Sequence, residues 1–427
     1  MFLEKIAESA VGLFFGIWLA RYLGPQQFGL LSYSQSFAGL FAAIAVLGLD
    51  SIVVREIVRG VSKTETILGT CFWLRICGSL VMLLILSFGV NLTSDDTYTR
   101  ILIFVIAGGM IFQSFNVIDF YFQAKVLSRY VVFAQLIGLL LSSVIKAVLI
   151  LAKAPLILFA VALLVDSIIL ALGLIYFYLR VDNNFQGWHF DTKAAKNVLR
   201  ESFPVMVSFL ATTISLRVNE IIIKQLLDTR SVGLYAASLK LVELWYFIPV
   251  LLSQSLFPAL VRARKEADYQ QKVETLASLL LVCSFCIVII LAVVKNFVII
   301  RVLGEKYAAS TELIPILMLA IVFVFFASLR KKILLAEGKT YFIMYYSVLT
   351  AIIMSGTSYF FTKSFGLVGA SLAYLVTWAS SILILPLFLG RFKAETFIFL
   401  RSFNFCNLRT LYKLTVREQY EDKKRGN

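Results

Sequence analysis

The dominant pattern along the chain is the repeated return of long apolar runs, each bounded by a short polar or charged stretch. A run of about 18 or more apolar residues is long enough to cross the hydrocarbon core of a bilayer, roughly 30 Å thick, as a helix. The alternating segments of about 10 residues that are typical of a membrane β-barrel are absent from the sequence. The pattern predicts an all-α polytopic membrane protein with about twelve transmembrane helices, near residues 2–20, 29–49, 68–90, 101–123, 130–151, 155–179, 202–227, 232–257, 275–299, 312–334, 341–362 and 367–389.

The distribution of basic residues predicts which side of the membrane each end of the chain faces. Most of the 40 Lys and Arg residues fall near the N-terminus, in the loops after even-numbered spans and in the C-terminal tail. Short loops rich in Lys and Arg remain cytoplasmic. Because the predicted number of spans is even, both termini are expected in the cytoplasm. The first span runs into "RYLGP" rather than a small-residue cleavage site, so we expect no cleavable signal peptide.

Composition agrees with a membrane location and narrows the possible functions. The chain is 60% hydrophobic and 15% charged, whereas a soluble chain carries roughly 25% charged residues. The net charge of +15 is spread over short loops, where it suits orientation and contact with anionic lipid head groups rather than nucleic acid. His189 is the only histidine, and Cys283 and Cys286 lie in an apolar run without further ligands. We therefore expect no metal site and no cofactor.

The two halves of the chain resemble each other weakly. The segments "FGLLSYSQSFAGLF" (28–41) and "VGLYAASLKLVELW" (232–245) align so that Gly29 matches Gly233. A second similarity, "KTETIL" with "KVETLA", follows in the same order. Two six-helix halves that both start from the cytoplasm form a parallel repeat, with a pseudo-two-fold axis along the membrane normal. This arrangement is typical of alternating-access transporters, which bind their substrate between the halves.

The repeat predicts a division of the chain into an N-terminal six-helix lobe over 1–190 and a C-terminal six-helix lobe over 191–390. The remaining residues, 391–427, form a basic and aromatic-rich tail that is expected in the cytoplasm. This tail could lie along the membrane surface as an amphipathic segment.

Charged residues within the predicted spans are the candidate functional groups. A charge at the bilayer centre costs roughly 2.5–3.5 kcal/mol, so these side chains are expected to face a polar cavity or one another. Arg217, Glu220 and Lys224 follow the i, i+3, i+7 spacing of one helix face. The other intramembrane charges are Arg75, Asp119, Lys146, Asp166, Lys240 and Glu243.

Two interpretations of these charges remain open. In the first, Arg217 pairs with Glu220, Lys240 pairs with Glu243, and Lys224 extends toward the membrane surface. In the second, the cations line a water-filled cavity for an anionic substrate, because a guanidinium binds two phosphate oxygens at once. The acids could then couple transport to protons or sodium ions; the candidates are Asp119, Asp166, Glu220 and Glu243.

The segment "ARYLGPQQFGLL" (20–31) is expected to turn the chain between the first two spans. Pro25 after Gly24 ends the first helix and fixes the corner. A structural turn is the simplest interpretation of this segment. Arg21, at the mouth of the predicted cavity, could also contribute to gating or to phosphate binding.

The segments "LARYLGPQQFGLLSYSQSFAGLFAAIAVLGLDSIVVREIVR" (19–59) and "VGLYAASLKLVELWYFIPVLLSQSLFPAL" (232–260) resemble the polysaccharide flippases of the Wzx type. This family shares a superfamily with the multidrug and toxin extrusion (MATE) antiporters and the lipid II flippase, whose fold has two six-helix lobes around a central cleft. The resemblance implies a substrate made of an oligosaccharide repeat unit joined through pyrophosphate to undecaprenol. It implies transport from the cytoplasmic to the periplasmic leaflet of a bacterial inner membrane, for O-antigen, capsule or exopolysaccharide synthesis.

The resemblance also implies how the charged residues would be used. The lobes would rock around a cationic central cavity, drawing on a gradient of H⁺ or Na⁺, and other polysaccharide-assembly membrane proteins are possible partners. The implied substrate-binding residues are Arg21, Arg75, Lys146, Arg217, Lys224 and Lys240.

Two other functions remain as alternatives. An extrusion antiporter for cationic compounds would share the fold, but it would favour acids in the cavity over cations. A membrane glycosyltransferase or polymerase acting on the same lipid carrier needs a sizeable outer loop with catalytic groups. The outer loops here are short, and "SDD" (94–96) is their only candidate, more typical of a solvated turn. We therefore expect a transporter rather than an enzyme.

Overall fold

The computed structural model is helical throughout the part of the chain that it describes, without a β-strand in that part. It describes residues 2–60, 63–93, 95–181, 184–249, 252, 269–388, 399 and 401–402. The first half contains α1 (Phe2–Val46), α2 (Asp50–Arg59), α3 (Thr64–Asn91), α4 (Thr97–Phe112), η1 (Gln113–Asn116), α5 (Val117–Ala124), α6 (Arg129–Leu151) and α7 (Leu156–Arg180). The second half contains α8 (Thr192–Leu226), α9 (Thr229–Glu243), η2 (Leu244–Tyr246), α11 (Tyr269–Asn296), η3 (Phe297–Leu303), η4 (Glu305–Glu312), α12 (Ile314–Ala336), α13 (Thr340–Leu383) and α14 (Leu385–Phe388).

Two of the helices, α1 and α13, each contain two membrane passages. A straight helix of 45 residues, the length of α1, would be about 68 Å long, more than twice the hydrocarbon thickness. Gly24 interrupts α1 with φ 69°, and Gly366 interrupts α13 with φ 58°, a left-handed conformation that glycine adopts without a steric penalty. Ten described helical segments are long and apolar enough to span a membrane. Counting these two twice gives the twelve passages predicted from the sequence.

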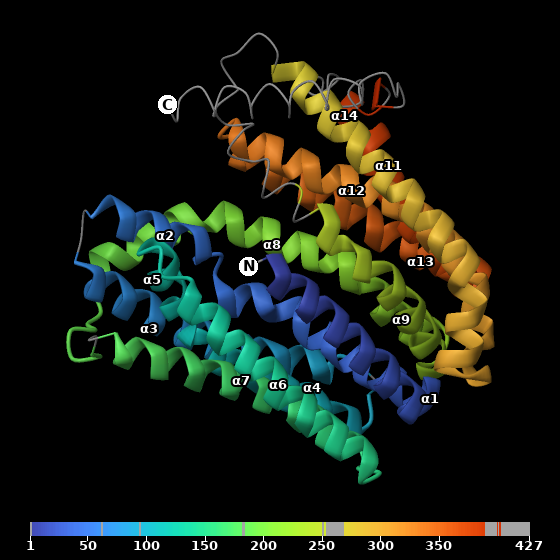
Figure 1. The fold of residues 1–427 in the computed structure, drawn as a ribbon, viewed down its shortest axis with the longest axis horizontal. Coiled ribbons are helices and arrows are strands. Elements are labelled where there is room, and N and C mark those ends of the chain that lie inside the picture. The colour runs from blue at the N-terminus through green and yellow to red at the C-terminus, as the bar shows by residue number, and fades with distance from the viewer. Residues whose placement is uncertain are drawn as a thin grey trace, which may run out of the picture.

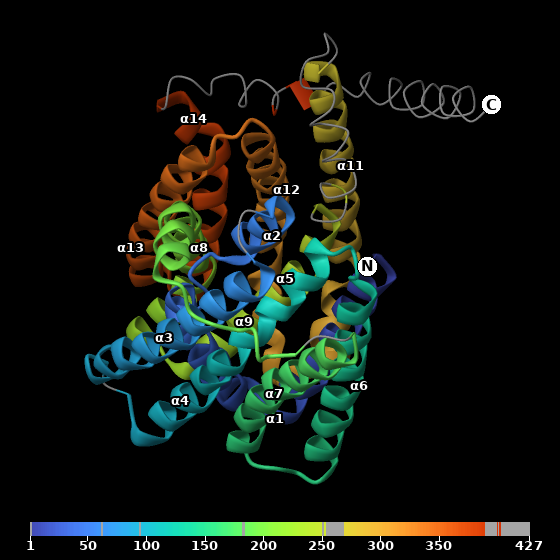
Figure 2. The same cartoon turned by 90° about the vertical axis from the view of Figure 1, so that its left-hand side faces the viewer.

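The helices are arranged in two groups with three helices between them (Figures 1 and 2). Helices α3, α4, α6 and α7 gather on one side, α11, α12 and α13 on the other, and α1, α8 and α9 lie in the middle. The middle helices pack on one another, α1 against both α8 and α9. We use the predicted boundaries to name the N-terminal lobe (1–190) and the C-terminal lobe (191–390). With these boundaries, α1 belongs to one lobe and α8 and α9 to the other. We call the contact of α1 with α8 and α9 the seam between the lobes.

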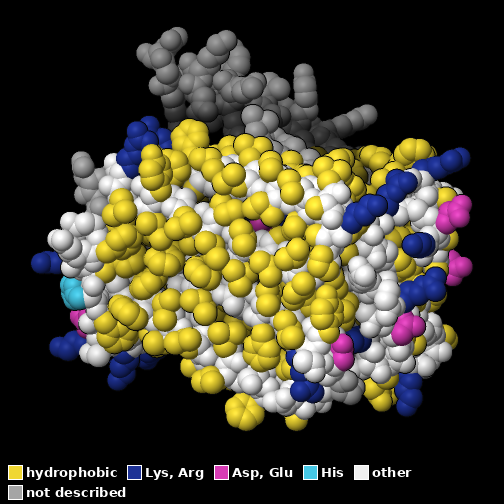
Figure 3. Space-filling view, turned by 90° about the horizontal axis from the view of Figure 1, so that it is seen from below, with side chains coloured by type: hydrophobic (Ala, Val, Ile, Leu, Met, Phe, Trp, Pro, Cys, Tyr) yellow, Lys and Arg dark blue, Asp and Glu magenta, His cyan; other side chains and the backbone are white. Residues whose placement is uncertain are grey.

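The surface is built for a lipid environment. Hydrophobic side chains cover most of one broad face, and the Lys and Arg side chains lie toward its two ends (Figure 3). On α6, Phe133, Ile137, Leu140, Val144 and Val148 are exposed at the three- and four-residue spacing of a lipid-facing stripe.

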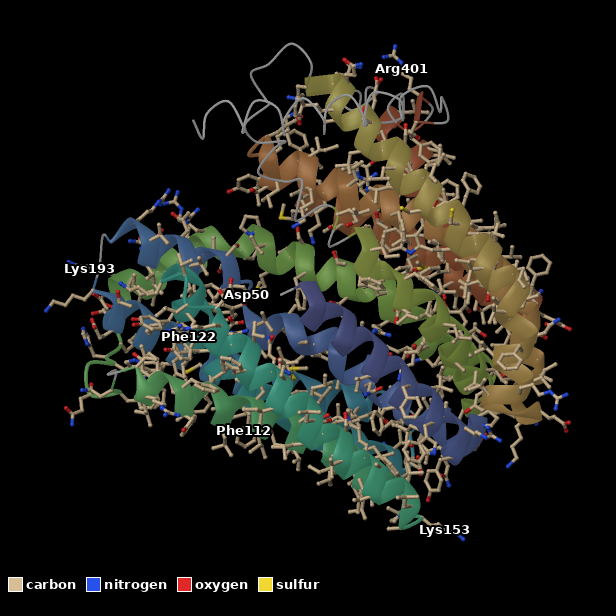
Figure 4. The ribbon with its side chains drawn as sticks, viewed as in Figure 1. Asp50, Phe112, Phe122, Lys153, Lys193 and Arg401 are labelled. Carbon is tan, nitrogen blue, oxygen red and sulfur yellow. The ribbon has the colours of Figure 1, made fainter. Side chains whose placement is uncertain are left out.

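The two charged ends define the axis along which the helices cross the membrane. Lys153, between α6 and α7, and Lys193, at the start of α8, lie at opposite ends of the molecule (Figure 4). We call the end with Lys153 the outer end and the end with Lys193 the inner end, following the orientation predicted from the basic residues.

Most of the predicted tail, and with it most of the proposed amphipathic segment, lies outside the described residues. Within the described part, Phe399 packs against Phe323 and Phe326 of α12, with ring centroids 5.8 and 4.6 Å away. Arg401 forms an ion pair of 3.2 Å with Glu274 of α11. These contacts attach the start of the tail to the C-terminal lobe.

Candidate functional site

A cluster of charges from α8 and α9 lies at the seam between the lobes. We call its four side chains, Arg217, Glu220, Lys240 and Glu243, the central cluster. The guanidinium of Arg217 is 3.8 Å from a carboxylate oxygen of Glu220 and 3.8 Å from one of Glu243. Glu220 is buried, and its carboxylate accepts a hydrogen bond from the hydroxyl of Ser36 on α1. The helical spacing that placed Arg217 and Glu220 on one face of α8 is therefore confirmed, and that face points across the seam.

Lys240 of α9 belongs to the same cluster but has no carboxylate within ion-pairing distance among the described residues. Its ammonium lies 5.1 Å from the centroid of the Phe28 ring on α1. Lys240 and Glu243 line a pocket of about 250 Å³ whose other walls are mostly apolar residues of α1 and α9. The Lys240–Glu243 ion pair, which was one part of the first sequence interpretation, is not formed. The Lys240 side chain is exposed, and Glu243 and Glu220 attract its charge electrostatically without forming an ion pair with it. An accessible ammonium without a bonded carboxylate can take an anion as its partner.

Uncharged polar groups fix the helices around this cluster. The side-chain amide of Asn219 donates to the hydroxyl of Tyr235, at 2.7 Å, and to the carbonyl of Ala370, at 3.3 Å. The hydroxyls of Tyr246 and Tyr374 lie 3.0 Å apart. These bonds connect α8 with α9 and α13, and η2 with α13. None of these four side chains was predicted from the sequence, because none is charged.

Lys146 forms an ion pair inside the N-terminal lobe. Its ammonium is 2.7 Å from Asp166 of α7 and 2.7 Å from the hydroxyl of Ser142. The Lys146 charge is still close enough to Lys240 for the two to repel electrostatically. Lys146 and Asp166 thus border the central cluster, but as a neutralised pair.

Arg75 is buried in the N-terminal lobe, away from the α8 and α9 charges. It lies 3.6 Å from Asp50, the first residue of α2, and 5.3 Å from the ring centroid of Phe120. Asp50 itself lies near the middle of the molecule (Figure 4). Asp119 is near enough to contribute to the field at Arg75, and its carboxylate accepts a hydrogen bond of 3.0 Å from Gln123. Asp50 was not among the predicted site residues because it lies just after the predicted span 29–49.

Lys224 forms its ion pair at the outer end, with Asp95 in the loop between α3 and α4. Asp95 also accepts hydrogen bonds from the hydroxyls of Tyr33, at 2.7 Å, and Thr93, at 2.8 Å. Burial alone would raise the pKa of Asp95, but the bonds from Lys224, Tyr33 and Thr93 outweigh it and lower that pKa. The "SDD" segment, interpreted from the sequence as a solvated turn, therefore supplies a buried carboxylate.

Arg21 ties the two lobes together at the same outer end. Its guanidinium donates to the backbone carbonyls of Arg301, at 3.4 Å, and Val302, at 3.2 Å, both in η3. The hydroxyl of Tyr307, in the following η4, donates to the carbonyl of Ala20, at 2.8 Å. Arg21 thus acts on the opposite lobe's backbone and not inside the central cluster.

The repeat-related glycines meet at the outer part of the seam. A Cβ atom on Gly29 would lie 2.0 Å from the carbonyl oxygen of Thr229, and one on Gly233 would lie 1.9 Å from that of Pro25. Only glycine allows the backbones of α1 and α9 to approach this closely. Residues related by a two-fold axis meet where that axis passes, so this contact agrees with the repeat found in the sequence.

The predicted site residues therefore separate into distinct groups. Arg217, Glu220, Lys240 and Glu243 come together at the seam, with Lys146 and Asp166 beside them. Arg75 and Asp119 lie within the N-terminal lobe, and Lys224 and Arg21 lie at the outer end.

Comparison with known proteins gives one family and one fold. The family model described as polysaccharide biosynthesis protein matches residues 18–312. Comparison with curated protein sequences gives no match. Among solved structures, the chain is similar to the lipid II flippase MurJ in an inward closed conformation, with a TM-score of 0.75, 14% identity and coverage of 96% of this chain and 92% of that one.

Two further solved structures share the fold. A multidrug resistance MATE family transporter of the MOP superfamily, in an inward-facing conformation, gives a TM-score of 0.73 at 15% identity, covering 91% of this chain and 95% of that one. A MOP superfamily transporter from Pyrococcus furiosus gives 0.62 at 14% identity, covering 95% of each chain. At these identities the likeness establishes the fold, and it confirms the expected MATE-like architecture.

Proposed function

Because the chain belongs to the family of polysaccharide biosynthesis proteins, we propose that it is a flippase for lipid-linked oligosaccharides. Its substrate is an oligosaccharide repeat unit joined through pyrophosphate to undecaprenol. The protein moves this unit from the cytoplasmic to the periplasmic leaflet of a bacterial inner membrane, with both of its own termini in the cytoplasm. The product serves the synthesis of O-antigen, capsule or exopolysaccharide.

The observation that carries this proposal is the pair of cations at the seam. Lys240 lines a pocket without a bonded carboxylate among the described residues, and Arg217 is held only loosely by Glu220 and Glu243. The Arg217 contacts of 3.8 Å are about 1 Å longer than a charge-assisted hydrogen bond. Phosphate oxygens can therefore replace the carboxylates at Arg217 and bond to the Lys240 ammonium, which Glu243 and Glu220 attract without an ion pair.

The transport step follows from this exchange. The diphosphate binds Arg217 and Lys240 while the isoprenoid chain stays in the bilayer, and the lobes rock about the seam to change the side to which the site opens. When Arg217 turns to the diphosphate, Glu220 and Glu243 lose their cationic neighbour. A proton or a sodium ion then restores neutrality, which couples transport to a cation gradient; Asp119 and Asp166 are secondary candidates for this role.

The proposal is tested by gene deletion and complementation in the host. We expect the deletion strain to lose surface polysaccharide and to accumulate undecaprenol-linked repeat units on the cytoplasmic side. Wild type should restore both, whereas Arg217→Ala and Lys240→Ala at equal membrane abundance should not. Lys153→Ala, which removes an exposed lysine in the α6–α7 loop, is the matched control and should behave as wild type.

A cation-coupled antiporter for drugs remains the second candidate, because the central cluster contains two carboxylates, Glu220 and Glu243, beside its cations. The same strains separate the two functions. Normal surface polysaccharide together with altered drug sensitivity in the deletion strain would favour the antiporter. If Arg217→Ala only lowers the amount of protein in the membrane, its contacts with the carboxylates serve folding.

A further inference from the structure

The polar cluster at the outer end joins three segments that are distant in the sequence. Tyr33 lies in the second passage of α1, Asp95 precedes α4, and Lys224 lies in the last turn of α8. Tyr33 and Asp95 belong to the N-terminal lobe and Lys224 to the C-terminal lobe. Only 16% of the Lys224 side chain and 5% of the Asp95 side chain are exposed.

The side chains of this cluster bond to one another. The Asp95 carboxylate accepts from Lys224, Tyr33 and Thr93, and the Lys224 ammonium lies 3.9 Å from the centroid of the Tyr33 ring. An ion pair whose carboxylate accepts further hydrogen bonds is strong when shielded from water, and removing either partner leaves a buried charge alone. The pair therefore holds the two lobes together for as long as it stays intact.

The cluster lies at the same seam as the glycine contact. Tyr33 follows Gly29 by four residues, and Ser36, which reaches Glu220, follows it by seven, so all three share the face of α1 that looks at the C-terminal lobe. A pocket of about 650 Å³ lies beside the ion pair and is lined by polar side chains that include Gln26, Gln225 and Thr229. Water can reach the seam through this pocket once the ion pair separates.

We propose that Tyr33, Asp95 and Lys224 form the lock of the outer gate. The lock keeps the seam closed at the outer end, and it breaks each time the site opens outward. Lys224 is then a gating residue whose ammonium is committed to Asp95, rather than one of the substrate-binding cations that the sequence suggested. This inference rests on the proposed function only in so far as the protein transports by alternating access.

The test measures how often the seam opens, with no substrate present. Ala237 is buried one helical turn beyond Gly233, and it lines the same pocket of about 250 Å³ as Lys240. Ala237→Cys, in a chain whose native cysteines are replaced by serine and that still complements the deletion, can react with a membrane-impermeant thiol reagent added outside only when the seam separates. The rate of labelling in cells is the readout.

We expect Lys224→Gln and Asp95→Asn each to raise this rate by at least about tenfold, the effect of losing a close interfacial charge pair. The exchanged pair Asp95→Lys with Lys224→Asp should return the rate toward that of the unaltered pair. Lys224→Arg, which keeps the charge, and Lys153→Gln, which removes an unrelated outer lysine, should leave it unchanged. The conservative and exchanged variants also show that a raised rate does not come from misfolding.

A labelling rate that stays low in both single variants would show that the ion pair does not close the outer gate. Loss of transport by Lys224→Gln without a change in labelling would show that Lys224 binds substrate instead. Because labelling needs no substrate, the result is separate from complementation. If wild type fails to restore surface polysaccharide but labelling rises as expected in the single variants, the ion pair still closes the outer gate, and the protein transports another substrate.

Discussion

The contact between Gly29 and Gly233 offers a direct way to disturb the seam without touching a charge. In Gly233→Ala, the new Cβ would lie 1.9 Å from the carbonyl oxygen of Pro25, whereas ordinary contact begins near 3.4 Å. The difference, 3.4 − 1.9 = 1.5 Å, has to come from backbone movement, because both clashing partners belong to the main chains of packed helices. Overpacking of this kind costs about 1–3 kcal/mol, and the cost falls on the outward-closed state alone.

A cost of this size shifts the balance between the outward-closed and outward-open states by roughly 5- to 150-fold, at about 1.4 kcal/mol for each factor of ten. We therefore expect Gly233→Ala to raise the outside labelling of Ala237→Cys and to reduce transport, with little change in the amount of protein in the membrane. Gly39→Ala is the matched control, since Gly39 also lies in α1 and no atom of another helix lies within 4 Å of the position that its new methyl group would take.

Wild-type labelling and transport in Gly233→Ala would refute the reasoning. Such a result would mean that α1 and α9 do not approach at these glycines during the transport cycle. The same outcome would also remove the structural support for a pseudo-two-fold axis at this point of the seam.

Three further outcomes follow from the described contacts. Lys146→Ala should destabilise the purified protein by about 2 kcal/mol. This cost is below the 3–5 kcal/mol of fully buried pairs, because the Lys146 and Asp166 side chains are 22% and 28% exposed. The double variant with Asp166→Ala should recover most of the lost thermal stability. The pKa of Asp95 is lowered in the folded protein. Its negative charge therefore stabilises the folded chain at pH values above the ordinary aspartate pKa of about 3.9. This stabilisation is lost as the pH falls through the lowered pKa. The difference in melting temperature between wild type and Asp95→Asn should stay constant from pH 8 to 5 and shrink below about pH 4. Arg21→Ala removes two hydrogen bonds from an exposed side chain and should change labelling of Ala237→Cys less than twofold, a much smaller effect than that of Lys224→Gln.

The helical architecture was predictable because hydrophobic length alone specifies a membrane span. The weak internal repeat also carried real information, since Gly29 and Gly233, aligned from the sequence, touch at the seam. Ser34 and Ser238, aligned in the same way, both donate to the carbonyl four residues earlier, at 2.8 and 2.9 Å. Local sequence therefore fixes features that depend on neighbouring residues or on repeat symmetry.

The pairing of the charges was not predictable to the same extent, because it depends on how distant segments meet. Arg217 and Glu220 share a helix face, and their spacing was enough to place them together. Lys224 lies on the same helix, but its partner is Asp95, 129 residues away in a loop. Lys240 and Glu243 have the same i, i+3 spacing as Arg217 and Glu220, yet Arg217 takes the Glu243 carboxylate. Helical spacing therefore identifies which charges share a face, and only the packing of the lobes decides which charges pair.

The most direct test of the central claim is a translocation assay with the purified protein in liposomes. Undecaprenyl-pyrophosphate-linked oligosaccharide would be placed in one leaflet, a cation gradient imposed, and the fraction reaching the other leaflet measured by its accessibility to an enclosed glycosidase. We expect wild type to move the substrate well above the rate of protein-free liposomes, and Arg217→Ala and Lys240→Ala to remain at that background. Translocation at the background rate by wild type, or at an undiminished rate by both variants, would contradict the claim that these cations carry the diphosphate across the membrane.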